Sequence, residues 1–265
     1  MQAIPVFTYH HILPHPVSGQ VQLDHFQDQL RSLSSANYRT IDCGELYAFL
    51  NGDLKLPCKT VMLTFDDGWR DNYIYARPVL EKYNMKAVIF VNTEYIRENE
   101  ETRGPYPEDY DYPSMQAFLK QEEIQPHYCT WNELRDMKES GIMDIQSHTM
   151  NHRLFLKQTD SIEKNRERLA QSLSQSREQI EKHLNAPCNG LAWPWGRYNA
   201  EYIRLAREAG YRMLFTTNKG TNTADQDSFA LNRIAVKDRG GRWLLQRSLI
   251  YRSSVLAKLY MKLRI

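Results

Sequence analysis

The sequence predicts an α/β fold in which strand–helix units build a parallel sheet or barrel. Short apolar runs rich in β-branched residues alternate with amphipathic helical patterns along most of the chain. The length of 265 residues suits one large domain or two small ones, and the lack of an internal repeat or a low-complexity linker favours one. The predicted strands are Ile4–Tyr9, Tyr38–Ile41, Thr60–Phe65, Ala87–Val91, Met143–Ser147, Gly190–Trp193, Met213–Thr216 and Ala230–Val236.

Three segments depart from this alternation. Thr159–Leu184 predicts one long polar helix whose thin apolar stripe packs on the outside of the fold. Arg97–His127, rich in proline and acidic residues, predicts a long loop that shapes specificity. Arg242–Ile265 predicts a basic helix that packs on the rest of the protein or extends from it. We therefore divide the chain into a sheet domain, residues 1–241, and a C-terminal helix, residues 242–265.

The composition places any function in a local site. With 42% hydrophobic and 25% charged residues, the chain is an ordinary globular protein rather than a disordered or coiled-coil one. Lys and Arg (34) nearly balance Asp and Glu (32), so we expect no nucleic acid partner. The four cysteines are widely spaced, with no C-x-x-C pair, and are interpreted as reduced packing residues; a thiolate nucleophile is the less favoured alternative.

The sequence also bears on location. No run approaches the roughly 20 consecutive apolar residues that cross a bilayer, and the first residues lack the basic and apolar regions of a signal peptide. We therefore expect a cytoplasmic protein. The basic C-terminal helix would suit peripheral contact with the inner face of the membrane, whereas a helix that docks on the protein itself is the simpler interpretation.

Asp66, Asp67 and Gly68 follow directly after the predicted strand Thr60–Phe65. Parallel α/β folds place their sites at the carboxyl ends of strands. Two adjacent carboxylates there repel each other unless a cation or a proton separates their roles. One could then bind a metal ion while its neighbour titrates. Taken alone, the two aspartates could equally cap the next helix and form a turn with the glycine.

His148 and His152 follow the predicted strand Met143–Ser147. A spacing of four residues on one helical turn directs both imidazoles to the same side, and histidine with a carboxylate is the usual ligand set of catalytic Zn²⁺. A lone histidine pair is commonly structural or solvent-exposed. Two ligand-like motifs that each follow a strand favour a metal site.

Two other strand ends carry ring side chains. Residues 190–199 read Gly-Leu-Ala-Trp-Pro-Trp-Gly-Arg-Tyr-Asn, and the tryptophans that flank the proline could pack in the core or stack on the apolar face of a sugar. His10 and His11 come directly after the first predicted strand, Ile4–Tyr9. Adjacent side chains of a strand point to opposite faces, so at most one of these histidines faces a site.

Together, the blocks Thr64–Gly68, Ser147–His152 and Trp193–Gly196 resemble the first three motifs of the polysaccharide deacetylases of carbohydrate esterase family 4. Their order and spacing agree with that family, and the resemblance spans roughly residues 1 to 240. It implies a single-domain, distorted (β/α) barrel of about seven or eight strands. It also implies a divalent metal, usually Zn²⁺ with Co²⁺ or Ni²⁺ as alternatives, and hydrolysis of the N-acetyl group of a hexosamine.

The resemblance assigns roles residue by residue. It makes Asp67, His148 and His152 the metal ligands and Asp66 the general base. The backbone N–H of Trp195 would complete the oxyanion site. For stacking of the sugar we take three aromatic residues at the strand ends as candidates: Trp69, Trp193 and Tyr198.

Two parts of the family pattern are displaced. The late histidine that usually supplies the general acid has no counterpart after residue 190. The chain instead resembles the circularly permuted branch that de-N-acetylates poly-N-acetylglucosamine, where a Tyr-His near the N-terminus supplies the acid, and His10 takes that role. The arginine that supports the base is absent before Pro194, and Arg233 could replace it.

These assignments predict metal-dependent de-N-acetylation of an N-acetylhexosamine in a polysaccharide or glycolipid precursor, with release of acetate. The partner is therefore a glycan that contains N-acetylhexosamine, and the oligomeric state is open. Two alternatives compete. A metal-dependent phosphoesterase often holds two metals, whereas three protein ligands favour one. A carbohydrate-binding barrel that has lost catalysis would not need the two aspartates and the two histidines.

Overall fold

The computed structural model describes residues 2–98, 127–153, 161–224 and 226–263. Most of the predicted loop Arg97–His127 lies outside the described residues, as do the first two residues of the predicted helix Thr159–Leu184. The strands are β1 (Val6–Tyr9), β2 (Ile12–Leu13), β3 (Val21–Gln22), β4 (Arg39–Thr40), β5 (Thr60–Phe65), β6 (Ala87–Val91), β7 (Met143–Ser147), β8 (Gly190–Ala192), β9 (Met213–Phe215) and β10 (Ile234–Ala235). The helices are α1 (Leu23–Ser35), α2 (Cys43–Leu50), α3 (Arg77–Lys82), α5 (Trp131–Glu139), α6 (Ile162–Leu184), α7 (Ala200–Glu208), α8 (Gly241–Tyr251) and α9 (Ser254–Lys262).

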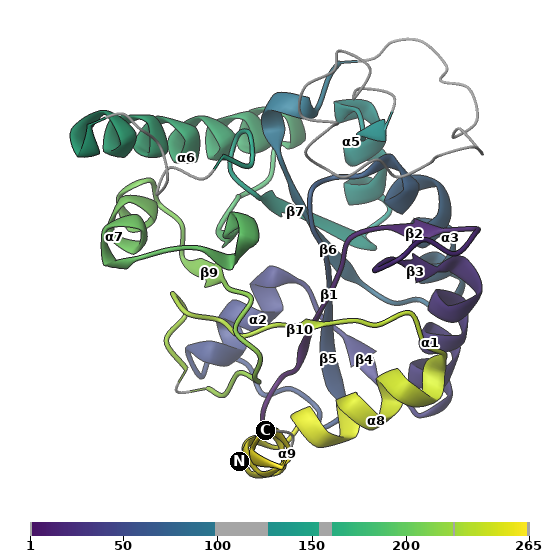
Figure 1. The fold of residues 1–265 in the computed structure, drawn as a ribbon. Helices are drawn as coiled ribbons and strands as arrows, with labels where there is room; N and C mark the ends of the chain where they lie inside the picture. Colours follow the sequence, from purple (N-terminus) through teal and green to yellow (C-terminus); the bar gives the residue numbers. More distant parts are fainter. Residues whose placement is uncertain (1, 99–126, 154–160, 225, 264–265) are drawn as a thin grey trace.

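A curled parallel sheet forms the centre of the molecule, and the helices lie around it (Figure 1). Its strands follow the order β10-β1-β5-β6-β7-β8-β9, and β4 pairs with the start of β5. Strands β2 and β3 pair with each other and form a separate small sheet that was not predicted from the sequence. The predicted barrel-like α/β fold is confirmed, and each predicted strand contains an observed one.

The two edges of the curled sheet, β9 and β10, are joined by one segment of the chain. The predicted strand Ala230–Val236 is broken, because Leu231 pairs with Phe215 of β9 whereas Ile234 and Ala235 pair with β1. The N–H of Thr216 donates to the carbonyl of Leu231 at 2.9 Å. The residues between these two pairings therefore cross the gap between the sheet edges.

The apolar character of the strands follows from burial on both faces. All six residues of β5 and all five of β6 are buried, as expected for a parallel sheet covered on both sides. Residues that share one face, such as Val6 and Met62, which are partners in register, form one apolar cluster with α2. The alternate face packs against the outer helices, with α1 supplying Leu30. This packing on both faces of the sheet holds the ends of the strands in fixed positions.

The C-terminal segment is two helices, and the prediction of one continuous helix over Arg242–Ile265 is wrong. Ser253 has an extended backbone (φ −125°, ψ 122°) that interrupts the helix, and its side chain accepts from the N–H of Leu256 at the start of α9. The same stretch pairs with the beginning of the chain, because Ala3 N–H donates to the carbonyl of Arg252 at 3.0 Å. No described helix is both long and apolar enough to cross a membrane.

The close approach of α8 to α1 requires glycine at position 241. A Cβ there would lie 1.9 Å from Ser32 Oγ and 2.3 Å from the backbone carbonyl of Asp28. We expect Gly241→Ala to lower the free energy of unfolding by about 1–3 kcal/mol through overpacking, measured by urea denaturation. Gly44→Ala in α2 is the control, since its Cβ would meet only Asp42 Oδ1 at 3.4 Å and should stabilise the helix. An unchanged urea midpoint for Gly241→Ala would contradict this packing.

Candidate active site

The turn after β5 presents two buried carboxylates. Asp67 (φ 77°) and Gly68 (φ 86°) both have left-handed backbone conformations, which turn the chain sharply at the end of the strand. A Cβ on Gly68 would lie 3.1 Å from Val91 Cγ1, so glycine also permits close packing against β6. The N–H of Asp66 donates to the carbonyl of Tyr9 at 3.0 Å, which continues the β1–β5 pairing. The two adjacent side chains consequently contact different neighbours.

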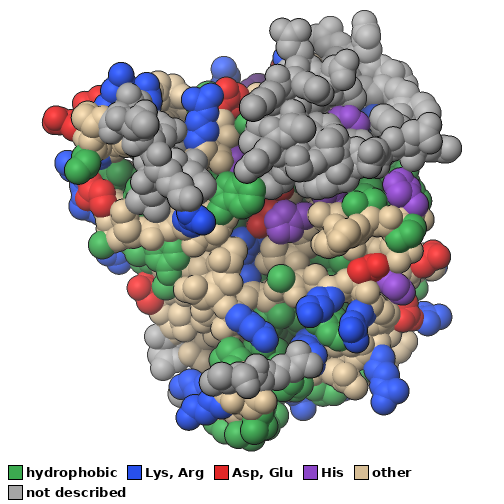
Figure 2. Space-filling model, in the orientation of Figure 1, with side chains coloured by type: hydrophobic (Ala, Val, Ile, Leu, Met, Phe, Trp, Pro, Cys, Tyr) green, Lys and Arg blue, Asp and Glu red, His purple; other side chains and the backbone are tan. Residues whose placement is uncertain are grey.

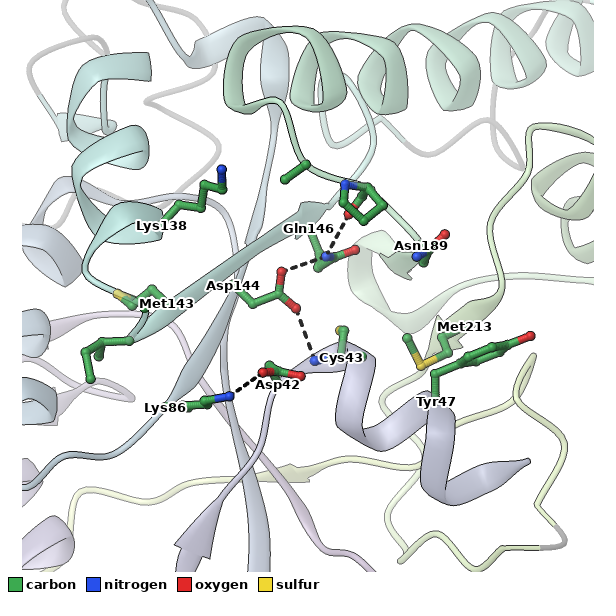
Figure 3. Close-up of a pocket in the computed structure, with 15 residues that line it drawn as sticks. Asp42, Cys43, Tyr47, Lys86, Lys138, Met143, Asp144, Gln146, Asn189 and Met213 are labelled. Atoms are coloured by element: carbon green, nitrogen blue, oxygen red, sulfur yellow. Dashed lines mark hydrogen bonds and ion pairs between the residues drawn. The ribbon is translucent and has the colours of Figure 1, made fainter. Parts of the chain in front are cut away.

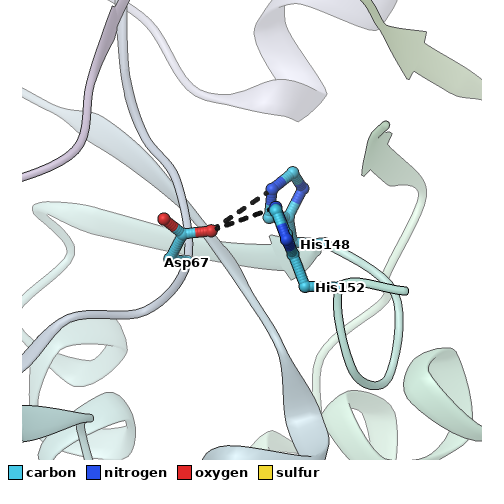
Figure 4. Close-up of side chains that lie close together, drawn as sticks. All are labelled: Asp67, His148 and His152. Carbon is cyan, nitrogen blue, oxygen red and sulfur yellow. Dashed lines mark ion pairs between the residues drawn. The ribbon is translucent and has the colours of Figure 1, made fainter. Parts of the chain in front are cut away.

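Asp67 faces His148 and His152 (Figure 4). Its Oδ1 lies 3.5 Å from the Nε2 atom of each imidazole, and the three ligand atoms all lie within 4.8 Å of one another. Its other oxygen, Oδ2, accepts from the indole N–H of Trp69 at 3.0 Å. One carboxylate oxygen is thus held by the protein while the other converges with two nitrogens.

Each histidine is positioned by its surroundings. His148 Nδ1 donates to the carbonyl of Ala192 at 2.7 Å, which leaves the lone pair of Nε2 directed at Asp67. The predicted helical turn between the histidines is wrong. Thr149 (φ 67°) and His152 (φ 57°) are left-handed, and such residues cannot continue a right-handed helix. The imidazoles nevertheless lie together, with ring centroids 4.9 Å apart.

Asp66 is paired with Arg233, which lies in the segment that joins β9 to β10. The guanidinium donates to Oδ1 at 2.6 Å and to Oδ2 at 2.9 Å, and its Nε–H donates to the carbonyl of Thr216 at 2.9 Å. Burial raises the pKa of Asp66, but the charge and hydrogen bonds of Arg233 together with the nearby His148 and His10 outweigh burial and hold the pKa well below its ordinary value. Asp66 is therefore an ionised carboxylate with a fixed orientation.

Two members of the Asp67, His148 and His152 cluster have shifted pKa values that favour a bound cation. Burial lowers the pKa of His152 to about 4, so its imidazole is neutral at physiological pH. Burial raises the pKa of Asp67, yet the neighbouring imidazoles hold it below its ordinary value. A carboxylate with two histidine nitrogens is a donor set of catalytic Zn²⁺ sites. The residues present thus fit a divalent cation.

A cavity of about 130 Å³ opens beside these groups. Its lining brings together residues from six separate parts of the described chain: Thr8, His10, Asp66, His148, His152, Trp193, Trp195, Thr217, Arg233 and Ala235. As predicted, only one of the adjacent histidines lines this cavity. His10 is exposed at its edge, whereas the buried His11 lies 2.6 Å from the carboxylate of Asp71.

Of the aromatic candidates, Trp69 and Tyr198 do not line the cavity. The Trp69 ring is buried against Tyr128, 4.3 Å away between centroids, and against His11, so a sugar cannot stack on it. We correct its predicted role, since it orients Asp67 through its indole N–H. The hydroxyl of Tyr198 accepts from Asn218 Nδ2 at 3.3 Å, outside the cavity lining.

The two tryptophans of the third motif differ. Trp193 lines the cavity but is only 1% exposed, so it forms a wall rather than an open stacking surface. Trp195 is 46% exposed, and its ring centroid lies 5.0 Å from that of His152. Of the two tryptophans that flank Pro194, Trp195 therefore offers the accessible aromatic surface at the cavity. The turn needs Gly196, because a Cβ there would lie 1.9 Å from Thr217 Oγ1.

Two supporting residues were missed. Asn92, which follows β6, donates from Nδ2 to the carbonyl of His148 at 2.6 Å and fixes the start of the histidine turn. Asp71 accepts from the N–H of Ile12 at 2.9 Å and contacts His11, which anchors the loop that carries His10. Asn92 could have been found, because it ends a predicted strand at the same edge as the aspartates. Asp71 carries no comparable signal in the sequence.

A larger cavity, of about 290 Å³, lies at the opposite end of the sheet, where β6, β7 and β9 begin (Figure 3). Its polar groups bind one another. Asp144 accepts from the N–H of Cys43 at 3.1 Å and from Gln146 Nε2 at 2.8 Å, and Lys86 donates to Asp42 at 2.6 Å. Burial raises the pKa of Asp144. We interpret this cluster as a structural cap for α2 rather than a reaction site.

Comparison with known proteins places this arrangement in a family. The family model described as polysaccharide deacetylase matches residues 53–214. The YxkH protein of Bacillus subtilis, whose name refers to polysaccharide deacetylases, is 30% identical over 233 residues, which cover 88% of this chain and 71% of YxkH. The poly-beta-1,6-N-acetyl-D-glucosamine N-deacetylase of Staphylococcus aureus is 23% identical over 230 residues, 86% of this chain and 71% of that protein.

A solved structure extends the similarity to three dimensions. The Streptococcus pyogenes deacetylase PplD, in complex with acetate, superposes with a TM-score of 0.72 and 27% identity. The match covers 92% of this chain and 97% of PplD. The fold that carries the site is thus shared almost from end to end.

The depressed pKa of His152 makes the metal-free protein sensitive to acid. Between pH 6.5 and 4 the unfolded chain takes up a proton on this histidine and the folded chain does not, so the free energy of unfolding falls as the pH falls. We expect a loss of about 3 kcal/mol across this window, measured by urea denaturation of metal-free protein. His152→Gln should show a correspondingly flatter profile. Equal slopes for the two proteins would contradict the assignment.

Proposed function

The chain belongs to the polysaccharide deacetylase family, and we propose that it removes the N-acetyl group from a hexosamine in a glycan with the help of a divalent metal ion. One observation carries this proposal. The three convergent ligand atoms of Asp67, His148 and His152 lie beside an ionised Asp66, and the cavity between them has an exposed tryptophan at its edge.

Asp67, His148 and His152 would hold the metal ion, with Zn²⁺ favoured by the two imidazoles and Co²⁺ or Ni²⁺ as alternatives. When bound, the ion supplies Lewis acidity toward an acetamide carbonyl and a water molecule. Trp69 keeps one oxygen of Asp67 occupied, and Ala192 fixes the tautomer of His148. These contacts orient the ligands before any ion arrives.

Asp66 would accept the proton of the attacking water. Its pKa lies below its ordinary value, so the carboxylate is available as a base throughout the neutral range. Arg233 acts as a positioning residue, because its two hydrogen bonds fix the plane of the carboxylate. Each oxygen of Asp66 keeps a second lone pair for the water.

His10 and the backbone of Trp195 would complete the reaction. The departing amine needs a proton, since an amide anion is a very poor leaving group, and His10 lines the cavity where it can donate one. The N–H of Trp195 would donate to the carbonyl oxygen of the acetyl group as that oxygen gains negative charge. The turn that carries it is fixed by Gly196 N–H, which donates to the carbonyl of Trp193 at 2.9 Å.

We propose N-acetylglucosamine in a polymer as the first substrate to test, since the Staphylococcus aureus relative is named for that activity. The exposed face of Trp195 suits stacking on the apolar face of such a sugar. A glycolipid precursor is the second candidate. The cytoplasmic location stays a prediction.

The alternatives have less support. A two-metal phosphoesterase needs more ligands than the single three-residue cluster found among the described residues. A binding protein without catalysis would have no need for the buried pair of Asp66 and Arg233, whose charges are costly to bury. Release of acetate without release of phosphate from a phosphorylated sugar would separate the first alternative from our proposal.

We expect Asp66→Asn to lower turnover of partly acetylated glucosamine oligomers by about 10²–10⁴-fold, because the base is lost. Metal content should be retained, since the ligand set is intact. Acetate release and mass spectrometry of the oligomers measure turnover, and elemental analysis measures the metal. Asp53→Asn, at an exposed position, is the control. Wild-type turnover by Asp66→Asn would show that another group is the base.

We expect His148→Ala to lower the bound metal well below about one ion per chain, because a ligand of a three-residue site is removed. Elemental analysis after dialysis gives the stoichiometry, and circular dichroism verifies the fold. His15→Ala, in a loop outside the cavity lining, should keep full occupancy. Undiminished metal binding by His148→Ala would place the ion elsewhere.

A further inference from the structure

Exposed apolar side chains gather on one small part of the surface. Seven large apolar side chains are exposed in the described part of the chain, and five of them lie on α8, on α9 or directly after α9. Four lie on α9 or directly after it: Val255 (66% exposed), Leu256 (49%), Leu259 (54%) and Leu263 (75%). Single exposed leucines need no explanation, but a contiguous group on one short helix does.

These four residues form one stripe of the helix. At 100° per residue, Val255, Leu259, Leu263 and Leu256 fall within an arc of about 100°. The opposite side carries Ala257, which is fully buried. The helix therefore has one face against the protein and a second apolar face against the surroundings. We refer to the four exposed residues as the α9 stripe.

The C-terminal segment that carries the α9 stripe is strongly basic. After Asp238 the sequence contains no acidic residue and seven basic ones, whereas the whole chain has a formal net charge of only +2. Lys258 and Lys262 are exposed and border the stripe on one side. Figure 2 shows hydrophobic and basic side chains together over α9, at the bottom of the view. The basic residues are Arg239, Arg242, Arg247, Arg252, Lys258, Lys262 and Arg264.

Next to α9 lies a cavity of about 600 Å³, and Lys219 and Lys258 both line it together with Thr221 and Asn232. It opens between the helix and the loop that follows β9. Two ammonium groups that line one hollow form a basic environment that suits a phosphate group. An apolar face thus lies directly beside a basic, polar hollow.

The helix is held firmly in this orientation. Tyr251 of α8 packs edge-on against Tyr260 of α9, with ring centroids 6.0 Å apart. The guanidinium of Arg247 lies 4.8 Å from the Tyr260 ring and 5.3 Å from the Trp243 ring. Aromatic rings with basic groups at the edge of an apolar face are typical of the water–lipid interface.

We propose that the α9 stripe docks in the plane of an anionic phospholipid bilayer. The four apolar side chains would enter the boundary between headgroups and acyl chains, as those of interfacial amphipathic helices do. The basic residues around them would be attracted to the negative surface potential, and the cavity beside Lys219 and Lys258 would take a lipid phosphate. Charge complementarity favours a lipid surface over a second copy of this chain, since the same basic patch would repel itself.

The test is co-sedimentation of the whole protein with vesicles of phosphatidylglycerol and phosphatidylcholine, compared with vesicles of phosphatidylcholine alone. We expect binding to the anionic vesicles that falls with added salt. The double variant Leu259→Glu/Leu263→Glu should bind at least about tenfold more weakly. It replaces two apolar side chains with carboxylates, which have the same negative charge as the lipid headgroups. Ile162→Glu is the control, since Ile162 is also an exposed apolar residue (90% exposed) but lies on α6.

A second variant tests the charges alone. Lys258→Gln/Lys262→Gln should weaken binding to anionic vesicles by about tenfold or more and leave the far-ultraviolet circular dichroism unchanged. Lys182→Gln on α6 should bind like the wild type.

Three results would overturn the proposal. One is equal binding of the wild type to both kinds of vesicle, and another is wild-type binding by the two double variants. The third is a wild-type protein that does not bind vesicles but forms a dimer in sedimentation velocity. If Leu259→Glu/Leu263→Glu dissociates that dimer, the α9 stripe is an interface with a second copy of the chain. None of these results depends on deacetylase activity.

Discussion

The ion pair between Arg233 and Asp66 is the interaction on which the site depends. Two adjacent carboxylates are buried at the end of β5, and each would be costly to keep ionised without a partner. The positive charge of Arg233 compensates the negative charge of Asp66. Asp67 instead contacts the histidine imidazoles and the indole of Trp69. Because each aspartate has its own partners, the pair divides into one base and one ligand. Loss of the guanidinium would leave an uncompensated buried charge, a change that costs about 3–5 kcal/mol in proteins.

Arg233 also links completion of the fold to assembly of the active site. Arg233 and Asp66 are 167 positions apart in the sequence, and Arg233 lies in the short stretch that crosses between β9 and β10. Its Nε–H is bonded to the carbonyl of Thr216, directly after β9. The guanidinium can therefore reach the carboxylate only when both edges of the curled sheet are in place. Completion of the fold and assembly of the site are one event.

The sequence was most informative where local pattern decides structure. Strands β5, β6 and β7 were predicted with their observed bounds. In β5 and β6 the signal is a mainly apolar run, which a parallel sheet covered on both faces favours. Four candidates for the centre, Asp66, Asp67, His148 and His152, meet since each follows such a strand. The failures involve tertiary contacts. The histidine turn is left-handed, and Trp69 is covered by aromatic neighbours contributed from distant segments.

The direction of β1 has a consequence for where the protein can work. Before β1, Ala3 is hydrogen-bonded to Arg252, which lies beside α9. After β1, the chain reaches His10 at the cavity. At 3.3 Å per residue, an extended segment from Ala3 to His10 would separate its two ends by about 20 Å. A molecule lying on a lipid surface through the α9 stripe would therefore hold its cavity at most about 20 Å from that end of the segment. Such an orientation would favour sugars on chains that rise from the bilayer over a sugar joined directly to a lipid headgroup.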